Sequence, residues 1–147
     1  MSKRWQLKIA SDLRHLPFVG QFVRESGRAA GLDEGDLFEV ELACEEACNN
    51  VIEHAYRNAQ GDIDITCTVT GSDFVIEIQD QGRPFDPTQF PPLGRRRRPG
   101  QVTIGGLGIH LMRELMDVIS YRFDPTTGNH LTMIKRGAAT RPAPGQN

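Results

Sequence analysis

Residues 41–56 read ELACEEACNNVIEHAY, and this stretch combines an apolar helix face with a polar stripe. Glu46, Asn50 and His54 recur every four residues, so on a helix they share one slowly drifting face. A different face carries the apolar residues Leu37, Val40, Cys44, Ala47, Cys48, Val51 and Ala55. A carboxylate, an amide and an imidazole beside a core face suit a general base, a metal ligand and a phosphate contact.

A simpler interpretation of the stripe is the solvated face of an amphipathic helix, which is a common arrangement. Two details count against it. Asparagine is a poor helix former, and Asn49 and Asn50 lie in the middle of the predicted helix, where neither can cap an end. Taken alone, the stretch does not decide between the two interpretations.

The composition is that of one soluble globular domain. The chain has 147 residues, of which 38% are hydrophobic and 24% are charged. Its formal net charge of −2 gives no general attraction to nucleic acid or to an anionic membrane. No stretch approaches the roughly 20 apolar residues of a membrane span, and the N-terminus lacks the apolar run of a secretory signal. We therefore expect a cytoplasmic protein with no direct nucleic-acid or membrane partner.

The cysteines are predicted to be small core residues. Cys44 and Cys48 lie on the apolar helix face, and Cys67 alternates with apolar neighbours in a predicted strand. A zinc site would need closer thiol spacing together with histidines, so we do not expect zinc.

Hydrophobic periodicity predicts the order strand, two helices, hairpin, long loop, helix and hairpin. The first helix has Pro17 near its start and Gly31 as its C-cap, and the second begins at Asp33 or Asp36 and runs to about Tyr56. The predicted strands cover residues 5–9, 62–70, 73–79, 121–123 and 131–134, and the last helix opens at 105–108.

This order predicts an α+β fold, a two-layer α/β sandwich whose sheet is mostly antiparallel and whose helices lie on one face. The predicted domain covers residues 1–136, and the Ala/Pro/Gly-rich segment 137–147 is predicted to be a disordered tail. Residues 81–104 form a long loop without periodicity, and loops of this length inside a domain are usually functional or mobile.

A polar turn follows the second strand of the central hairpin. A buried carboxylate at a strand end, here Asp80, can accept a hydrogen bond from an exocyclic amine such as that of adenine. Gly82 would let a flat ring lie against the backbone. The alternative is an ordinary polar turn containing two prolines.

The last helix is preceded by the glycine-rich segment Gly105, Gly106, Leu107, Gly108 and Ile109. Glycines at a helix N-terminus leave backbone N–H groups exposed at its positive end, which can bind an anion. The segment is neither a P-loop nor a dinucleotide-binding motif, because the lysine and the βαβ unit are missing. A flexible hinge is the alternative.

Arg95, Arg96, Arg97 and Arg98 form a run of positive charge in the long loop. Such runs are most often solvated. Between the Asp80 turn and the glycine-rich segment, the run could instead close over phosphates. Nucleic-acid binding is a third interpretation, but no aromatic residues are interleaved with the arginines.

Together, the order and spacing of these motifs resemble the Bergerat ATP-binding fold of gyrase, mismatch-repair ATPases, histidine kinases and anti-sigma factor serine kinases. The resemblance runs from about Trp5 to Arg136 and is greatest to the anti-sigma factor serine/threonine kinases. Those small chains share Glu-Glu-Ala-x-x-Asn-x-x-x-His-Ala-Tyr and Gly-Leu-Gly-Ile with residues 45–56 and 106–109 here.

The resemblance implies ATP and Mg²⁺ as cofactors and gives each motif a role. Asn50 would coordinate Mg²⁺, Glu46 would be the general base, His54 would contact the phosphate side, and Asp80 would anchor adenine. The other implied nucleotide-binding residues are Gly82, Pro84, Gly105, Gly106, Leu107, Gly108, Ile109 and Thr132, the last supporting adenine through water. Pro84 departs from the wider superfamily, which has a second glycine there.

Glu46 favours one reaction class within this superfamily. A carboxylate one turn before the metal-binding Asn50 can take a proton from an attacking hydroxyl group. Histidine kinases need a helical hairpin that carries their acceptor, and gyrase-type enzymes need a transducer domain, neither of which is expected in this chain.

The resemblance therefore implies an ATP-dependent protein serine/threonine kinase that acts as an anti-sigma factor in a partner-switching module. It would phosphorylate an anti-sigma-antagonist protein, bind a sigma factor in its other state and form a homodimer. The alternative is an ATP-gated protein-binding regulatory module with little or no kinase activity, and a generic ATP hydrolase is a third possibility.

Overall fold

Strands and helices follow the predicted order in the computed structural model, which describes residues 3–89 and 106–139. The strands are β1 (Arg4–Ala10), β2 (Asp62–Thr70), β3 (Asp73–Asp80), β4 (Val118–Asp124) and β5 (Gly128–Lys135). The helices are α1 (Leu16–Ala30), α2 (Glu34–Asn50) and α3 (Gly106–Leu115), with short helical turns at Leu13–His15, Val51–Ala55 and Pro87–Gln89.

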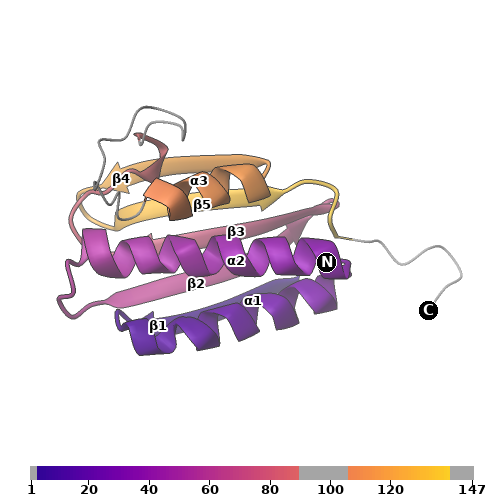
Figure 1. The fold of residues 1–147 in the computed structure, drawn as a ribbon, viewed down its shortest axis with the longest axis horizontal. Helices are drawn as coiled ribbons and strands as arrows, with labels where there is room; N and C mark the ends of the chain where they lie inside the picture. The colour runs from indigo at the N-terminus through magenta and orange to yellow at the C-terminus, as the bar shows by residue number, and fades with distance from the viewer. Residues whose placement is uncertain (1–2, 90–105, 140–147) are drawn as a thin grey trace, which may run out of the picture.

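The described strands form one antiparallel sheet in the order β1-β2-β3-β5-β4. Figure 1 shows α1, α2 and α3 lying on the same side of this sheet. The arrangement confirms the predicted α+β two-layer sandwich. Within it, the pairing of β3 with β5 sets Asp80 directly opposite Asn129.

The core lies between the sheet and the helices because alternate residues of β2 and β3 are apolar. The inward-facing side chains are Ile63, Ile65, Cys67, Phe74, Ile76 and Ile78, all buried. Cys44 and Cys48 from α2 are buried against the same layer, and all three cysteines are free thiols. Burial raises the pKa of the Cys67 thiol to about 12, as expected for a core residue.

The two long helices have the predicted ends. Pro17 lies in the first turn of α1, and Gly31 caps its C-terminus in the left-handed conformation with a φ of 90°. Asp33 caps α2, and its side chain accepts a hydrogen bond from the Asp36 backbone N–H at 2.8 Å.

The second helix departs from the prediction at its C-terminal end. It was expected to continue as one α-helix to Tyr56, but α2 ends at Asn50 and a π-helical turn covers Val51–Ala55. The Ala55 carbonyl accepts a hydrogen bond from the Arg83 N–H at 3.0 Å, so a distant segment holds this wider turn. The turn changes the direction of every side chain after Asn50, including that of His54.

The final hairpin is longer than predicted. Strands were expected at 121–123 and 131–134, which leaves Asn129 between them, but Asn129 lies within β5. The connecting turn is tightened by Asp124, whose Oδ1 accepts hydrogen bonds from the N–H groups of Thr126 and Thr127. Gly128 then enters the strand with a φ of 92°.

The packed part of the chain also extends beyond Arg136, where the domain was predicted to end. Ala138 and Ala139 are buried, and the Ala139 N–H donates a hydrogen bond to the Ser72 carbonyl at 2.9 Å. These small side chains fit against the turn between β2 and β3. Residues 140–147 of the predicted tail lie outside the described residues.

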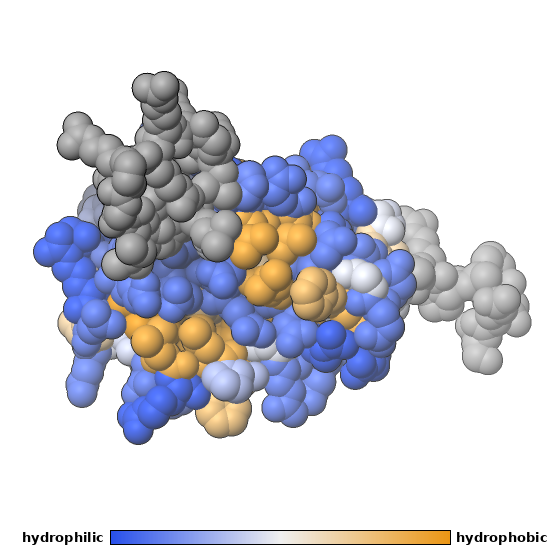
Figure 2. Space-filling model, in the orientation of Figure 1, coloured by the Kyte–Doolittle hydropathy of each residue, from blue (hydrophilic) through white to orange (hydrophobic). Residues whose placement is uncertain are grey.

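The helix layer carries exposed apolar side chains among hydrophilic ones (Figure 2). Phe18 of α1 and Phe38 of α2 are the most exposed of the large apolar residues in the described part of the chain, at 57% and 59%. Within that same part, no helix combines the length and the apolar character needed to cross a membrane.

Candidate functional site

One small cavity brings Asn50, from the polar stripe of α2, close to Asp80 and the turn after β3. It is lined by Ala47, Asn50, Val51, Ala55, Asp80, Phe85, Pro87, Met112, Tyr121, Asn129 and Leu131. Its volume of about 20 Å³ has room for a water-sized molecule. Two predicted site residues, Asn50 and Asp80, thus lie around a common space.

Asp80 ends β3 inside this cavity and is only 3% exposed. Its Oδ1 accepts hydrogen bonds from the Gly82 N–H and from Asn129 Nδ2, each at 2.8 Å. Burial raises the pKa of the Asp80 carboxyl, and the hydrogen bonds from Asn129 and Gly82 oppose that rise. An ionised carboxylate in this position can accept an N–H group from a ligand.

Asn129 is a site residue that the sequence analysis missed. It lies opposite Asp80 on β5 and is 3% exposed. Its neighbour Gly128 has no room for a side chain, because a Cβ there would lie 2.0 Å from the Asp80 carbonyl oxygen. The alternation of side chains along a strand could have identified Asn129, because it lies on the same face of β5 as the apolar residues Leu131 and Met133.

Asn50 is buried at the end of α2, so it does not belong to a solvated helix face. Its Nδ2 donates to Met112 Sδ at 3.6 Å, and its Oδ1 is buried with no hydrogen-bond partner among the described residues. An unpaired buried oxygen is unfavourable unless a ligand uses it. A hard cation that prefers oxygen donors, such as Mg²⁺, fits this atom.

Glu46 lies one turn before Asn50 and faces the first turn of α3. A Cβ added at Gly108 would lie 2.2 Å from Glu46 Oε2, so the carboxylate occupies the space that this glycine leaves free. Burial and, secondly, the charge of Glu53 raise the pKa of the Glu46 carboxyl. A raised pKa makes the carboxylate a better proton acceptor, as a general base requires.

If Glu46 is the predicted general base, Gly108→Ala should slow the reaction that Glu46 serves while leaving the fold intact. The new methyl group would displace the Glu46 carboxylate, and we expect kcat to fall roughly tenfold or more. The helix itself should gain about 1 kcal/mol, because alanine is the better helix former. Steady-state kinetics and thermal unfolding would measure both effects. An unchanged kcat in this variant would contradict the placement of Glu46.

Gly82, which was predicted to lie beside the base, packs closely against the π-helical turn. A Cβ at this position would lie 2.6 Å from the Ala55 backbone carbon, so glycine permits the close approach of the turn after β3 to the π-helical turn. A hydrogen bond also holds these two turns together, because Arg83 Nε donates to the His54 carbonyl at 2.9 Å.

Gly82→Ala should therefore destabilise the protein by roughly 1–3 kcal/mol, because backbone atoms cannot move aside as a flexible side chain can. Chemical denaturation would give the free energy of unfolding. Gly35→Ala is the matched control, since the nearest atom to a Cβ at Gly35 is Asp33 Oδ1 at 3.5 Å, an ordinary contact. Equal stability of the two variants would show that the contact with Ala55 is unimportant.

His54 packs against Phe85, one of the residues that line the cavity. Its ring stacks on Phe85 with 4.8 Å between centroids and 15° between planes. The Nε2 atom is buried and has no hydrogen-bond partner within the described part of the chain. The π-helical turn causes this orientation, because it rotates His54 away from the direction that a continuous α-helix would give. A phosphate contact by His54 stays a prediction.

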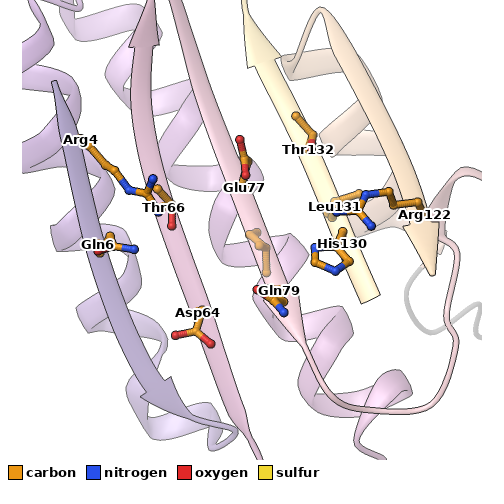
Figure 3. A pocket seen from close by; sticks show the side chains of 11 residues that line it. Arg4, Gln6, Asp64, Thr66, Glu77, Gln79, Arg122, His130, Leu131 and Thr132 are labelled. Atoms are coloured by element: carbon orange, nitrogen blue, oxygen red, sulfur yellow. The ribbon is translucent and has the colours of Figure 1, made fainter. Parts of the chain in front are cut away.

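Thr132 was predicted to support adenine, but the structure does not bring it to the cavity that Asp80 lines. Asp80, Asn129 and Leu131 face the helices, whereas Thr132 lies one residue out of phase and faces the opposite side of the sheet. It lines a separate polar hollow of about 320 Å³ together with Arg4, Glu77 and others. Figure 3 shows these side chains on the sheet face that the described helices leave uncovered.

The other predicted nucleotide-binding residues with described side chains do not line the cavity beside Asp80. Pro84 is exposed, and Ile109 is buried with 2% of its surface accessible, so its side chain belongs to the core. Gly106 and Leu107 begin α3. Gly105 and the arginine run 95–98 lie outside the described residues.

Comparisons with known proteins agree with this geometry. The histidine kinase-like ATPase domain matches residues 9–135 of the chain. The chain is 31% identical over 111 residues to the serine-protein kinase RsbW of Bacillus licheniformis, covering 71% of this chain and 68% of that protein. It is 36% identical over 104 residues to the serine/threonine-protein kinase BtrW of Bordetella bronchiseptica, covering 69% of this chain and 71% of that protein.

A solved structure supports the same fold. The RsbU and RsbW domains of Rv1364c from Mycobacterium tuberculosis match with a TM-score of 0.66 and 17% identity. The match covers 96% of this chain and 34% of the other, so this chain spans about a third of the length of that protein. At this identity the likeness concerns the fold alone.

Proposed function

Because the chain belongs to the histidine kinase-like ATPase domain family, we propose that it is an ATP-dependent protein serine/threonine kinase acting as an anti-sigma factor in a partner-switching module. The relatives named above are serine or serine/threonine protein kinases, and they align over about two thirds of their length. ATP is the nucleotide that this family implies. The protein substrate and Mg²⁺ are part of the proposal.

The observation that carries the proposal is the pairing of Glu46 with Asn50 on one rigid helix. The Glu46 carboxylate, with its raised pKa, lies against the first turn of α3, and the unpaired Oδ1 of Asn50 follows one turn later. The first group is suited to accept a proton and the second to hold a cation. A module that only bound ATP would need the second group but not the first.

Asn50 Oδ1 would hold Mg²⁺, which would neutralise charge on the phosphates when bound. Glu46 would take the proton from a serine or threonine hydroxyl of the protein substrate. The oxygen of that hydroxyl would form a bond to the γ-phosphorus, the bond from this phosphorus to the bridging oxygen would break, and ADP would leave. Asp80 would hold the adenine end of the nucleotide.

The proposed partners are proteins. The substrate would be an anti-sigma-antagonist protein, and a sigma factor would bind the kinase in its other state. A homodimer and a cytoplasmic location also belong to this proposal. Their support is the similarity to the named kinases and, for the homodimer, the family resemblance of the motifs.

The experiment is to measure ADP formation with Mg²⁺-ATP, in the presence and absence of a purified antagonist-type protein. A kinase should release ADP in step with phosphate appearing on that protein. Tight ATP-dependent complex formation without ADP would instead identify an ATP-gated binding module. ADP formation that is independent of the second protein would identify a hydrolase.

A further inference from the structure

The side-chain amide of Asn129 has all of its hydrogen-bonding positions filled by groups of the protein. Its Nδ2 donates to Asp80 Oδ1 at 2.8 Å and to the Arg83 carbonyl at 2.9 Å. Its Oδ1 accepts from the Phe85 N–H at 3.2 Å and from the Tyr121 hydroxyl. The partners come from β3, from β4 and from the turn after β3, so Asn129 joins three segments at the base end of the cavity.

These partners also fix which way the amide faces. The Phe85 N–H can only donate, so the atom that it meets must be the amide oxygen. The Asp80 carboxylate accepts when ionised, so the atom that faces it must be the amide nitrogen. A flipped amide would lose both bonds, which is costly for a side chain that is only 3% exposed.

The fixed amide of Asn129 in turn fixes the orientation of the Asp80 carboxylate. Among the described residues, both hydrogen bonds to its carboxylate are made to Oδ1, from Asn129 Nδ2 and the Gly82 N–H. Two donors on one oxygen prevent rotation of the carboxylate and favour its ionised form. The other oxygen, Oδ2, is then a fixed acceptor for a single N–H group.

We propose that Asn129 is a positioning residue for nucleotide recognition, and that by holding Asp80 as a fixed acceptor it makes the site select a base with an exocyclic amine. This assignment rests on the proposed function, because it presumes that ATP is the ligand of the cavity. Adenine offers an amine at this edge, whereas hypoxanthine has a carbonyl oxygen at the same position. A fixed carboxylate repels that oxygen.

Without Asn129, the Asp80 carboxylate loses one of its two described donors. It can then rotate, or it can hold a proton and donate to a carbonyl oxygen. Discrimination between the two bases should fall as a result. A residue that served stability alone would weaken the binding of both nucleotides by the same factor.

The test compares the dissociation constants of ATP and inosine triphosphate for the full chain and for Asn129→Leu. We expect the wild-type protein to prefer ATP, and the ratio of the two constants to fall roughly tenfold to a hundredfold in the variant, as loss of a hydrogen bond to a charged group predicts. Thermal unfolding would establish that the variant is folded.

Asn129→Ala provides a second measurement with a smaller side chain. Alanine cannot donate a hydrogen bond to Asp80, so this variant should lose selectivity as the leucine variant does. Tyr121→Phe is the control, because it removes one partner of the Asn129 oxygen and leaves the bond to Asp80 in place. That control should retain most of the preference for ATP.

The outcomes separate this assignment from the function on which it rests. If the wild-type protein prefers ATP and either folded Asn129 variant keeps the same ratio, the assignment is wrong while the kinase proposal stands. If the wild-type protein binds neither nucleotide, both the Asn129 assignment and the kinase proposal are wrong. A reduced ratio in both variants, with the ratio kept in Tyr121→Phe, supports the assignment.

Discussion

Replacing Asp80 with asparagine is expected to weaken ATP binding by roughly a hundredfold or more. The new amide would keep an acceptor for the Gly82 N–H and Asn129 Nδ2, so its own N–H₂ would take the place of Oδ2 in the cavity. A donor would then meet the amine of adenine, which is also a donor. Titration calorimetry with ATP would measure the loss.

The same variant should be at least as stable as the wild-type protein at neutral pH. Burial raises the pKa of the Asp80 carboxyl above its ordinary value of 3.8, so the ionised group is less favourable in the folded state than in the unfolded state. That unfavourable contribution is fully present above the raised pKa and disappears as the pH falls towards 3.8. The difference in melting temperature should therefore shrink on acidification.

These two measurements separate recognition from folding. If Asp80→Asn bound ATP with unchanged affinity, Asp80 would not be the base anchor. If the variant lost affinity and also melted far below the wild-type protein at neutral pH, its loss of binding would reflect structural damage. A base anchor at Asp80 requires lower affinity in a variant of equal or greater stability.

Glu46→Gln is expected to reduce the rate of phosphoryl transfer by roughly 10²–10⁴-fold, the usual contribution of a general base. Glutamine keeps the size and the polar contacts of the side chain but cannot accept the proton. ATP affinity should be retained or should increase, because a negative charge is removed from the side of the cavity where phosphates are proposed to bind. Single-turnover transfer at saturating ATP would isolate this step.

Glu53→Gln is the matched control for this prediction. Glu53 lies close enough for its charge to raise the pKa of the Glu46 carboxyl, but it is not proposed to accept the proton. Its replacement should lower that pKa and change the transfer rate by only a few-fold. Equal losses in the two variants would mean that the local negative charge, rather than the base at Glu46, supports the reaction.

The sequence predicts most of the framework because its patterns are local. The alternation of apolar residues from Ile63 to Ile78 specifies the hairpin of β2 and β3, and the turn residues between them specify its register. Asp33 and Gly31 mark helix ends through their own hydrogen bonds and backbone geometry. Each of these features depends on residues close together in the chain.

The features that the sequence does not predict are those in which distant segments of the chain meet. The π-helical turn after Asn50 is held by Arg83, which lies beyond the whole β2–β3 hairpin, so no pattern within residues 41–56 indicates it. The place of Gly82 against Ala55 has the same origin. Local patterns cannot show contacts of this kind.

The omission of Asn129 from the predicted site has a different cause. Asn129 follows Thr127 and Gly128 in a segment typical of a turn, so it was placed outside the strand. Once β5 begins at Gly128, strand parity puts Asn129 on the helix side with Leu131 and Met133, and Thr132 on the other side. The sequence therefore indicates the face on which Asn129 lies, but only once the first residue of β5 is known.

The most direct test of the central claim is the intact mass of an antagonist-type protein after incubation with Mg²⁺-ATP and this protein. We expect a mass gain of one phosphate group on a serine or threonine, and little or no gain when Glu46→Gln replaces the wild-type chain. An unmodified antagonist in a stable ATP-dependent complex with the wild-type protein would contradict the proposed kinase activity.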